Sequence, residues 1–198
     1  MRKSVQLAKT RTAIMKTATK LFLNKGFGGT STRDIAKEIG ITQPALYHHF
    51  NDKEVLFLDV MTAHGSKVRQ EVNKVMQDSD QTGEDLLWEL AKTLLKLHPK
   101  DIYEQWQSAG DLLSQSSKRK LSVIFMIDYI EPVSAFFKRP ELKLRPDVLP
   151  KEAAELFISS LSPMFNSFQK FGGRSITDEQ RNRIILDVFM NGLNQREN

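Results

Sequence analysis

Two short helical segments joined at a glycine, within residues 32–53, constrain the fold of this chain more than any other feature. Ile35 and Ile39 share the inner face of the first segment, and Leu46 is the apolar anchor of the second. Gly40 permits the sharp turn between them. This pattern is typical of a helix-turn-helix, in which the second helix faces outward, and it predicts double-stranded DNA as the partner.

Positive charge is concentrated in the part of the chain that holds this pattern. Residues 1–53 contain 10 Lys and Arg against 3 Asp and Glu, a balance of +7. The whole chain has 29 and 24, so the remainder holds 19 and 21, a balance of −2. A protein that contacts a polyanion with one end is expected to show this asymmetry. The alternative is a helical adaptor that binds no DNA and has a solvated basic face.

The outward face of the second helix carries side chains suited to DNA recognition. Gln43 can form two hydrogen bonds to adenine, and Ala45 offers a methyl-sized surface to a thymine methyl. Tyr47, His48 and His49 can donate to phosphate oxygens. For Tyr47 we expect a packed ring with the hydroxyl pointing outward.

Residues 10–56 resemble the N-terminal DNA-binding domain of the TetR family of bacterial transcriptional regulators. The matching stretches are ATKLFLNKG, STRDIAKEIGIT and LYHHFNDKEVL. The resemblance implies DNA contacts by Thr32, Arg33, Thr42, Gln43, Pro44, Ala45, Tyr47, His48, His49 and Lys53. Within this set Lys53 is expected to hold a phosphate. Family members differ widely in their C-terminal domains, so the resemblance implies no particular ligand.

Nearly the whole chain has helical apolar periodicity, and no stretch has the alternation of a strand. The expected helices outside the motif are Thr10–Lys25, Asn51–Met76, Glu84–Leu97, Lys100–Ser114, Lys118–Lys138, Lys151–Phe171 and Asp178–Gln195. The predicted fold class is therefore all-α, with about nine helices. We expect a three-helix DNA-binding domain in residues 1–53 and a larger helical effector-binding and dimerisation domain in residues 54–198.

Local signals predict where several helices begin. Ser31 and Asp34 have the spacing of a capping box, and Thr42, Asn51 and Thr177 are candidate N-caps. Two other signals predict interruptions. The 118–138 helix is apolar nearly all round, which predicts a central buried position, and a proline at position 132 is expected to kink or split it.

The C-terminal helices supply candidates for self-association and for ligand binding. Their wide apolar stripes predict a homodimer interface made of Phe157, Leu161, Phe165, Phe168, Ile185, Val188 and Phe189. Aromatic and sulfur-bearing side chains that either fill a core or line an effector pocket are Trp88, Tyr103, Trp106, Phe125, Tyr129, Phe157 and Met164. The identity of such a small-molecule effector does not follow from the sequence.

Enzymatic, metal-binding and membrane functions find little support. The chain has no cysteine, which excludes disulfides and thiol nucleophiles and fits a cytoplasmic location. His48 and His49 are adjacent on a helix and diverge by about 100°, so they are poorly placed to share a metal. No catalytic motif and no apolar run long enough for a membrane span occurs. We expect no cofactor.

These observations together favour a ligand-released repressor that binds a palindromic operator as a homodimer. An effector-independent DNA-binding protein with an architectural or cell-division role is the alternative.

Overall fold

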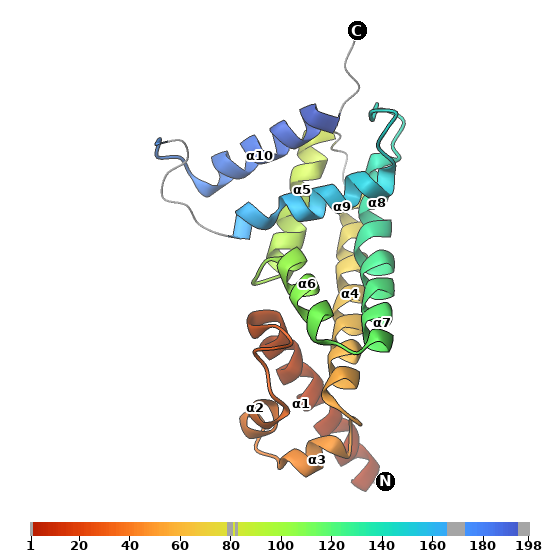
Figure 1. Cartoon of the computed structure of the whole chain (residues 1–198), viewed down its shortest axis with the longest axis vertical. Helices are drawn as coiled ribbons and strands as arrows, with labels where there is room; N and C mark the ends of the chain where they lie inside the picture. The colour runs from red at the N-terminus through yellow and green to blue at the C-terminus, as the bar shows by residue number, and fades with distance from the viewer. Residues whose placement is uncertain (1, 79–80, 82, 166–172, 194–198) are drawn as a thin grey trace. The chain divides into compact units, whose positions relative to one another are not determined.

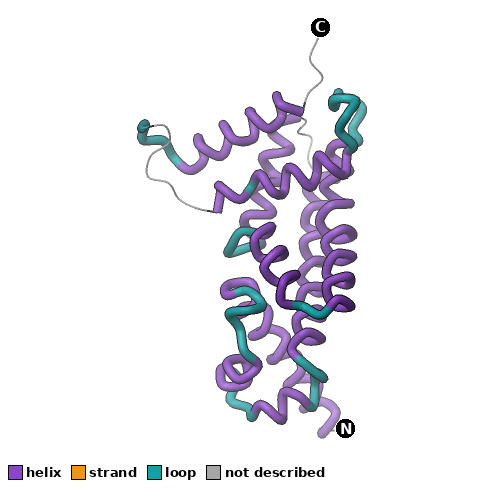
Figure 2. Tube along the Cα trace, viewed as in Figure 1, coloured by secondary structure: helices purple, strands orange, loops and turns teal. Residues whose placement is uncertain are grey.

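The computed structural model describes residues 2–78, 81, 83–165 and 173–193, and within these ranges it contains helices and loops but no strand (Figures 1 and 2). In chain order its elements are α1 (Arg2–Lys25), α2 (Thr32–Glu38), α3 (Gln43–Tyr47), α4 (Lys53–Asp78), α5 (Gly83–Leu97), α6 (Ile102–Leu112), α7 (Gln115–Phe125), the π-helix η1 (Met126–Ile130), α8 (Glu131–Phe137), α9 (Pro150–Ser160), the 3₁₀-helix η2 (Ser162–Phe165) and α10 (Asp178–Leu193). Because α7, η1 and α8 are continuous, the described residues form nine α-helical rods. The all-α prediction is confirmed.

The residues that begin the helices are mostly those expected. Ser31 Oγ accepts from the Asp34 amide at 3.1 Å, and the Asp34 carboxylate accepts from the Ser31 amide, which completes a capping box on α2. Thr177 caps α10 in the same way, with its Oγ1 3.1 Å from the Gln180 amide. The cap of α4 is one residue later than expected. Asp52 Oδ1, not Asn51, accepts from the Val55 amide at 2.7 Å.

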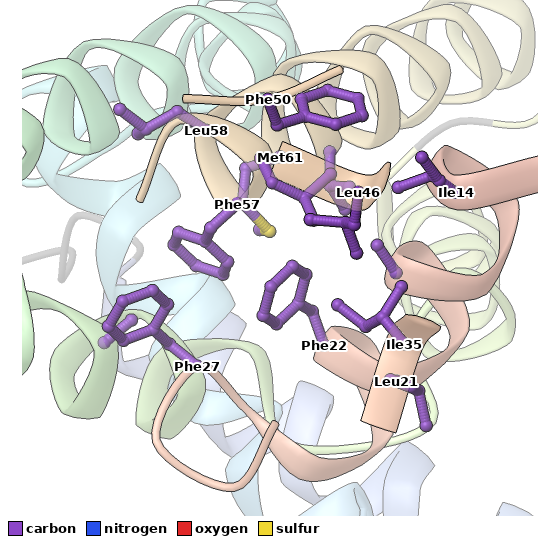
Figure 3. Close-up of a cluster of buried hydrophobic side chains, with 14 of the residues drawn as sticks. Ile14, Leu21, Phe22, Phe27, Ile35, Leu46, Phe50, Phe57, Leu58 and Met61 are labelled. Atoms are coloured by element: carbon purple, nitrogen blue, oxygen red, sulfur yellow. The ribbon is translucent and has the colours of Figure 1, made fainter. Parts of the chain in front are cut away.

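Two compact units make up the chain. The first comprises Met1–Ser66 and Glu104–Ile124. Its core lies among α1, α2, α3 and the first part of α4, where Ile14, Ile35 and Leu46 are fully buried (Figure 3). Phe22 and Phe57 meet edge to face with ring centroids 5.1 Å apart. This core fixes the helix-turn-helix to the start of α4.

Segments far apart in sequence complete the first unit. Gln105 Nε2 donates to the carbonyl of Leu23 at 2.7 Å, which fastens α6 to the end of α1. The carboxylate of Glu54 accepts from the amide and hydroxyl of Ser114, at 2.9 and 2.5 Å. Packing therefore groups residues 104–124 with the N-terminal helices. The predicted boundary after residue 53, between the DNA-binding domain and the effector-binding domain, concerns function rather than packing and stays a prediction.

The second unit comprises Lys67–Tyr103 and Phe125–Asn198. Here α9 packs on α8 and α10, and α10 also packs on α5. The proline at position 132 does not end the helix before it. It is preceded by η1, in which the amide of Glu131 donates to the carbonyl of Met126, five residues back. A single π-helical turn thus absorbs the interruption that proline predicts.

Burial along the α7–η1–α8 rod differs from the prediction. The second half is buried as expected, with Tyr129 and Phe136 inaccessible to solvent. The first half is not, since the side chains of Val123, Met126 and Ile127 are 55%, 40% and 45% exposed. The expectation of a uniformly buried helix was wrong because an apolar sequence does not determine how many neighbours surround it. No helix in the described residues is long and apolar enough to cross a membrane.

Candidate nucleic-acid interface

The turn between α2 and α3 is a hydrogen-bonded glycine C-cap. Gly40 has φ +72°, a left-handed conformation that glycine adopts without a steric penalty. The Ile41 amide donates to the carbonyl of Ala36 at 3.0 Å, and the Gly40 amide donates to Lys37 at 3.2 Å. These two bonds form a Schellman motif, which satisfies the last carbonyls of α2 and redirects the chain into α3. The glycine that the sequence singles out therefore sets the angle between the two helices.

The position of α3 is fixed by the N-cap at its start and by one side chain that is buried in the core. Thr42 Oγ1 accepts from the Ala45 amide at 3.3 Å, so Thr42 is the predicted N-cap. Pro44 lies in the first turn, where its missing amide hydrogen costs no helical bond. Leu46 is fully buried in the first unit and anchors the helix to the core. The rest of α3 is left to face outward.

A three-residue hydrogen-bond network joins α2 to α3. Gln43 Nε2 donates to Thr32 Oγ1 at 2.9 Å, and Thr32 Oγ1 lies 3.1 Å from the hydroxyl of Tyr47. Thr32 itself is buried, at 5% exposure, so its hydroxyl orients the two α3 side chains from beneath. Tyr47 as a whole is 41% exposed and its hydroxyl contacts the buried Thr32, so the structure differs from the expected packed ring and outward hydroxyl. A glutamine amide has a second donor hydrogen and an acceptor oxygen, so Gln43 keeps capacity to bond a base edge.

The end of α3 is supported by Arg11 of α1. Its Nη1 donates to the carbonyl of His49 at 3.0 Å, and its guanidinium lies 4.2 Å from the centroid of the Phe50 ring. Its Nη2 pairs with Asp59 at 2.7 Å. Arg11 is thus a positioning residue that the sequence did not reveal, because nothing distinguishes it from the other nine basic residues of this segment.

Lys53, the first residue of α4, is held against an aromatic ring. Its ammonium lies 4.0 Å from the centroid of Phe27, a cation–π contact. Partial burial lowers the pKa of the Lys53 ammonium. The Phe27 ring restricts the positions of the Lys53 ammonium. A phosphate contact by Lys53 therefore depends on its packing against Phe27.

The predicted DNA-contacting residues differ in exposure. Those exposed are Arg33, Thr42, Pro44, Tyr47 and His48, those half-buried are Gln43, Ala45, His49 and Lys53, and Thr32 is buried. All ten come from α2, the turn after it, α3, the two residues that follow α3 and the start of α4, within the first unit. The structure therefore brings the predicted set together on one helix-turn-helix, with Thr32 in a supporting position.

Comparison with known proteins agrees with this geometry. Residues 14–60 match the family model described as bacterial regulatory proteins, tetR family. Residues 14–60 therefore contain a DNA-binding domain of the TetR-family type.

Relatives match over only part of the chain. The uncharacterized HTH-type transcriptional regulator YerO of Bacillus subtilis is 32% identical over 100 residues, which are 50% of this chain and 32% of YerO. The tetracycline repressor protein class C of Escherichia coli is 44% identical over 46 residues, 23% of this chain and 21% of the repressor. The chain thus spans about a third or less of the length of these two relatives.

Solved structures of the family match over nearly the whole chain. One is the crystal structure of AibR in complex with isovaleryl coenzyme A and operator DNA. It has a TM-score of 0.60 and 23% sequence identity, and the match covers 92% of this chain and 97% of AibR. This likeness shows that the two chains share a fold.

The residues predicted to line an effector pocket are divided between the two units of the chain. Trp106 belongs to the first unit, where it lines a small cavity of about 10 Å³ with Phe22 and Phe57. The other six belong to the second unit. There Trp88 packs under the guanidinium of Arg183, 5.2 Å from its ring centroid, beside a cavity of about 30 Å³. Neither cavity has the volume of a drug-sized ligand.

One of the remaining pocket candidates, Tyr129, belongs to a buried polar contact, and a second, Phe125, lies beside its ring. The hydroxyl of Tyr129, in η1, lies 2.9 Å from Nε2 of His98. The Phe125 ring is 5.3 Å from the Tyr129 ring. Phe157 and Met164 are buried side chains of the second unit, and Tyr103 is half-buried. Tyr129, Phe157 and Met164 therefore lie in the core of the second unit, and an effector pocket among these residues stays a prediction.

The residues predicted for the dimer interface also divide by burial. Phe157 and Leu161 are fully buried within their own chain, and Phe157 packs on Phe189 with ring centroids 5.9 Å apart. Phe165, Ile185 and Phe189 are half-buried, whereas Val188 is 65% exposed. Phe168 lies outside the described residues. Leu156 of α9, which the sequence did not single out, is 49% exposed.

No group of three or more metal-binding side chains occurs in the described part of the chain.

Proposed function

We propose that this TetR-family chain is a transcriptional regulator that binds operator DNA by placing α3 in the major groove. The main evidence for this is that three hydrogen-bond contacts hold α3 and its side chains in place. Thr32 orients Gln43 and Tyr47, and Arg11 holds the carbonyl at the end of the helix. Side chains fixed in this way lose little conformational freedom on binding. The +7 charge of residues 1–53 supplies attraction to phosphates.

We further propose that two copies act together on a palindromic operator. Among the described residues of α9 and α10, Leu156 and Val188 are large apolar side chains that are exposed. Burying them against a second copy would remove apolar surface from water through an isologous interface. A two-fold dimer presents its recognition helices about 34–36 Å apart, which matches successive major grooves. The buried Phe157 and Leu161 would support this interface from within.

Oligomeric state tests the dimer proposal directly. Val188→Glu places a charge on the exposed α10 face and should give a monomer with weakened operator affinity, measured by light scattering and DNA binding. Leu112→Glu is the matched control and should stay dimeric, since Leu112 is 59% exposed on α6, outside the basic segment 1–53. A wild-type monomer at micromolar concentration would contradict the proposal.

A repressor released by a small molecule is the regulatory mode that we propose. AibR, with the same fold, was crystallised with both isovaleryl coenzyme A and operator DNA. A ligand releases DNA only if it binds more tightly to a conformer with low operator affinity. The helices between residues 84 and 168 remain the predicted location for such an effector.

Selection of bound sequences from random duplex DNA, using the full chain, tests the function as a whole. The proposal predicts enrichment of a palindrome and an affinity that falls steeply with salt. Affinity without sequence preference would favour the architectural alternative. Absence of any salt-dependent binding would favour the helical adaptor and contradict the proposal.

A further inference from the structure

A ligand-sized groove lies on the first unit between the first half of α4 and α7. Its volume is about 470 Å³, within the range of small-molecule sites. The lining residues are Val55, Leu58, Asp59 and Thr62 of α4 and Arg119, Lys120, Val123 and Ile124 of α7. None of them belongs to the predicted effector pocket or to the predicted DNA-contacting set.

The walls of the groove are apolar and partly exposed. Val55 and Val123 are 38% and 55% exposed, although valine is among the residues most often buried in proteins. Leu58 and Ile124 lie deeper, and both belong to or pack on the core of the first unit. A bound apolar body would therefore remove surface from water on both helices.

The charges of the groove favour an anion. Arg119 and Lys120 are both exposed, and neither has a carboxylate within ion-pair distance in the described residues. The one acid in the lining, Asp59, is already paired with Arg11 at 2.7 Å. The positive charges of Arg119 and Lys120 on α7 are thus not neutralised by an acid, whereas the negative charge of Asp59 on α4 is neutralised by Arg11.

A hydrogen-bonded connection holds the two helices together next to the groove. The carboxylate of Glu54 caps the start of α7 through the amide and hydroxyl of Ser114. These bonds lower the pKa of Glu54, so the carboxylate stays ionised at neutral pH. The groove is consequently preformed and does not need the ligand to assemble it, which reduces the entropic cost of binding.

We propose that this groove binds an amphipathic organic anion, with its apolar body against Val55 and Val123 and its carboxylate paired with Arg119 and Lys120. A cation is disfavoured by the two free basic groups, and a bare phosphate makes no use of the apolar walls. The ligand class is therefore a carboxylate that carries a flexible aliphatic or an aromatic body.

Isothermal titration of the full chain with decanoate, decanol and decylammonium, without DNA, tests this site. Decanoate should bind saturably at one site, and the neutral and cationic analogues should bind about tenfold more weakly or worse because they lack the charge-assisted bonds. The double variant R119A/K120A should lose about tenfold in decanoate affinity. Both side chains are exposed, so the variant is expected to fold.

The matched control is K118A, which removes an exposed lysine from the same helix that does not line the groove. It should bind decanoate like the wild type. Equal decanoate affinity in R119A/K120A and K118A, or equal affinity of the wild type for all three probes, would overturn the proposal. Because no DNA is present, neither outcome bears on the proposed function, which the selection experiment decides on its own.

Discussion

The helix ends of the helix-turn-helix and the interior of the second unit depend on contacts of different sequence range. In the helix-turn-helix, bonds between residues two to five apart, such as Ser31 with Asp34 and Ile41 with Ala36, set the helix ends. In the second unit, buried polar contacts join Tyr129 to His98, 31 residues away, and Ser162 to Asp101, 61 residues away. The first kind of contact leaves a pattern in the sequence, and the second kind does not.

The largest expected effect comes from the core beneath the helix-turn-helix. Leu46→Ala should lower the free energy of unfolding by about 2–5 kcal/mol, since it leaves a cavity at a fully buried position. Chemical denaturation measures this loss. Leu112→Ala, at a position that is 59% exposed, is the control and should cost about 0.5 kcal/mol or less. Equal losses in the two variants would mean that Leu46 does not anchor α3.

A smaller loss is expected from the long-range contact in the second unit. Tyr129→Phe removes the hydroxyl that bonds the buried His98 imidazole, at a cost of about 1–1.5 kcal/mol. Thermal unfolding of Tyr129→Phe and of the half-buried Tyr103→Phe provides the comparison. If Tyr129→Phe were as stable as Tyr103→Phe, the polar contact would contribute nothing and the two regions would differ less than we infer.

Capping residues allow the two regions to be compared through the same kind of bond. Ser31→Ala on α2 and Thr177→Ala on α10 should each cost about 1 kcal/mol, because each removes an N-cap acceptor. Denaturant midpoints measured side by side test the equality. A loss at Ser31 with none at Thr177 would show that the end of α10 is set by its packing rather than by its cap.

The smallest effects are pH-dependent and have opposite signs. Hydrogen bonds from Ser114 lower the pKa of Glu54, so its stabilisation is present above the usual value of 4.5 and is lost as the pH falls below it. Burial raises the pKa of Asp128, outweighing the Arg69 guanidinium 3.3 Å away. Asp128 therefore destabilises the fold at neutral pH, and this penalty is relieved as the pH falls towards its usual 3.8.

Glu54→Gln and Asp128→Asn separate these contributions. As the pH falls from 6 to 4, the wild type should lose its advantage in free energy of unfolding over Glu54→Gln. Over the same range, the wild type should become more stable relative to Asp128→Asn. Urea denaturation at each pH gives both slopes. Slopes of the same sign for the two variants would contradict the assignment.

Much of the helix-turn-helix was predictable from sequence because its determinants are local. The caps at Ser31 and Thr42, the glycine turn at Gly40 and the anchoring by Leu46 all match the structure. What the sequence did not reveal is the contact of Arg11 with the carbonyl of His49, 38 residues away. An arginine gives no sign of its partner when several basic residues surround it.

The second unit was predictable in its helices but not in its burial. Periodicity located α9 and α10 without showing that α10 packs the half-buried Phe189 against Phe157 and leaves Val188 exposed. The proline at position 132 predicted an interruption, and the structure absorbs it in η1 without ending the helix. The α4–α7 groove could not be predicted at all, because its two walls are about 60 residues apart in sequence.

The central claim is that the outward face of α3 recognises DNA, and the affinity of Gln43→Ala for the selected operator tests it most directly. Fluorescence anisotropy at fixed salt would compare Gln43→Ala with Gln107→Ala, an exposed glutamine on α6. The account predicts that Gln43→Ala loses about 1–3 kcal/mol of operator binding and discriminates less between operator and random DNA. Gln107→Ala should behave like the wild type. Wild-type affinity and specificity in Gln43→Ala would contradict the claim.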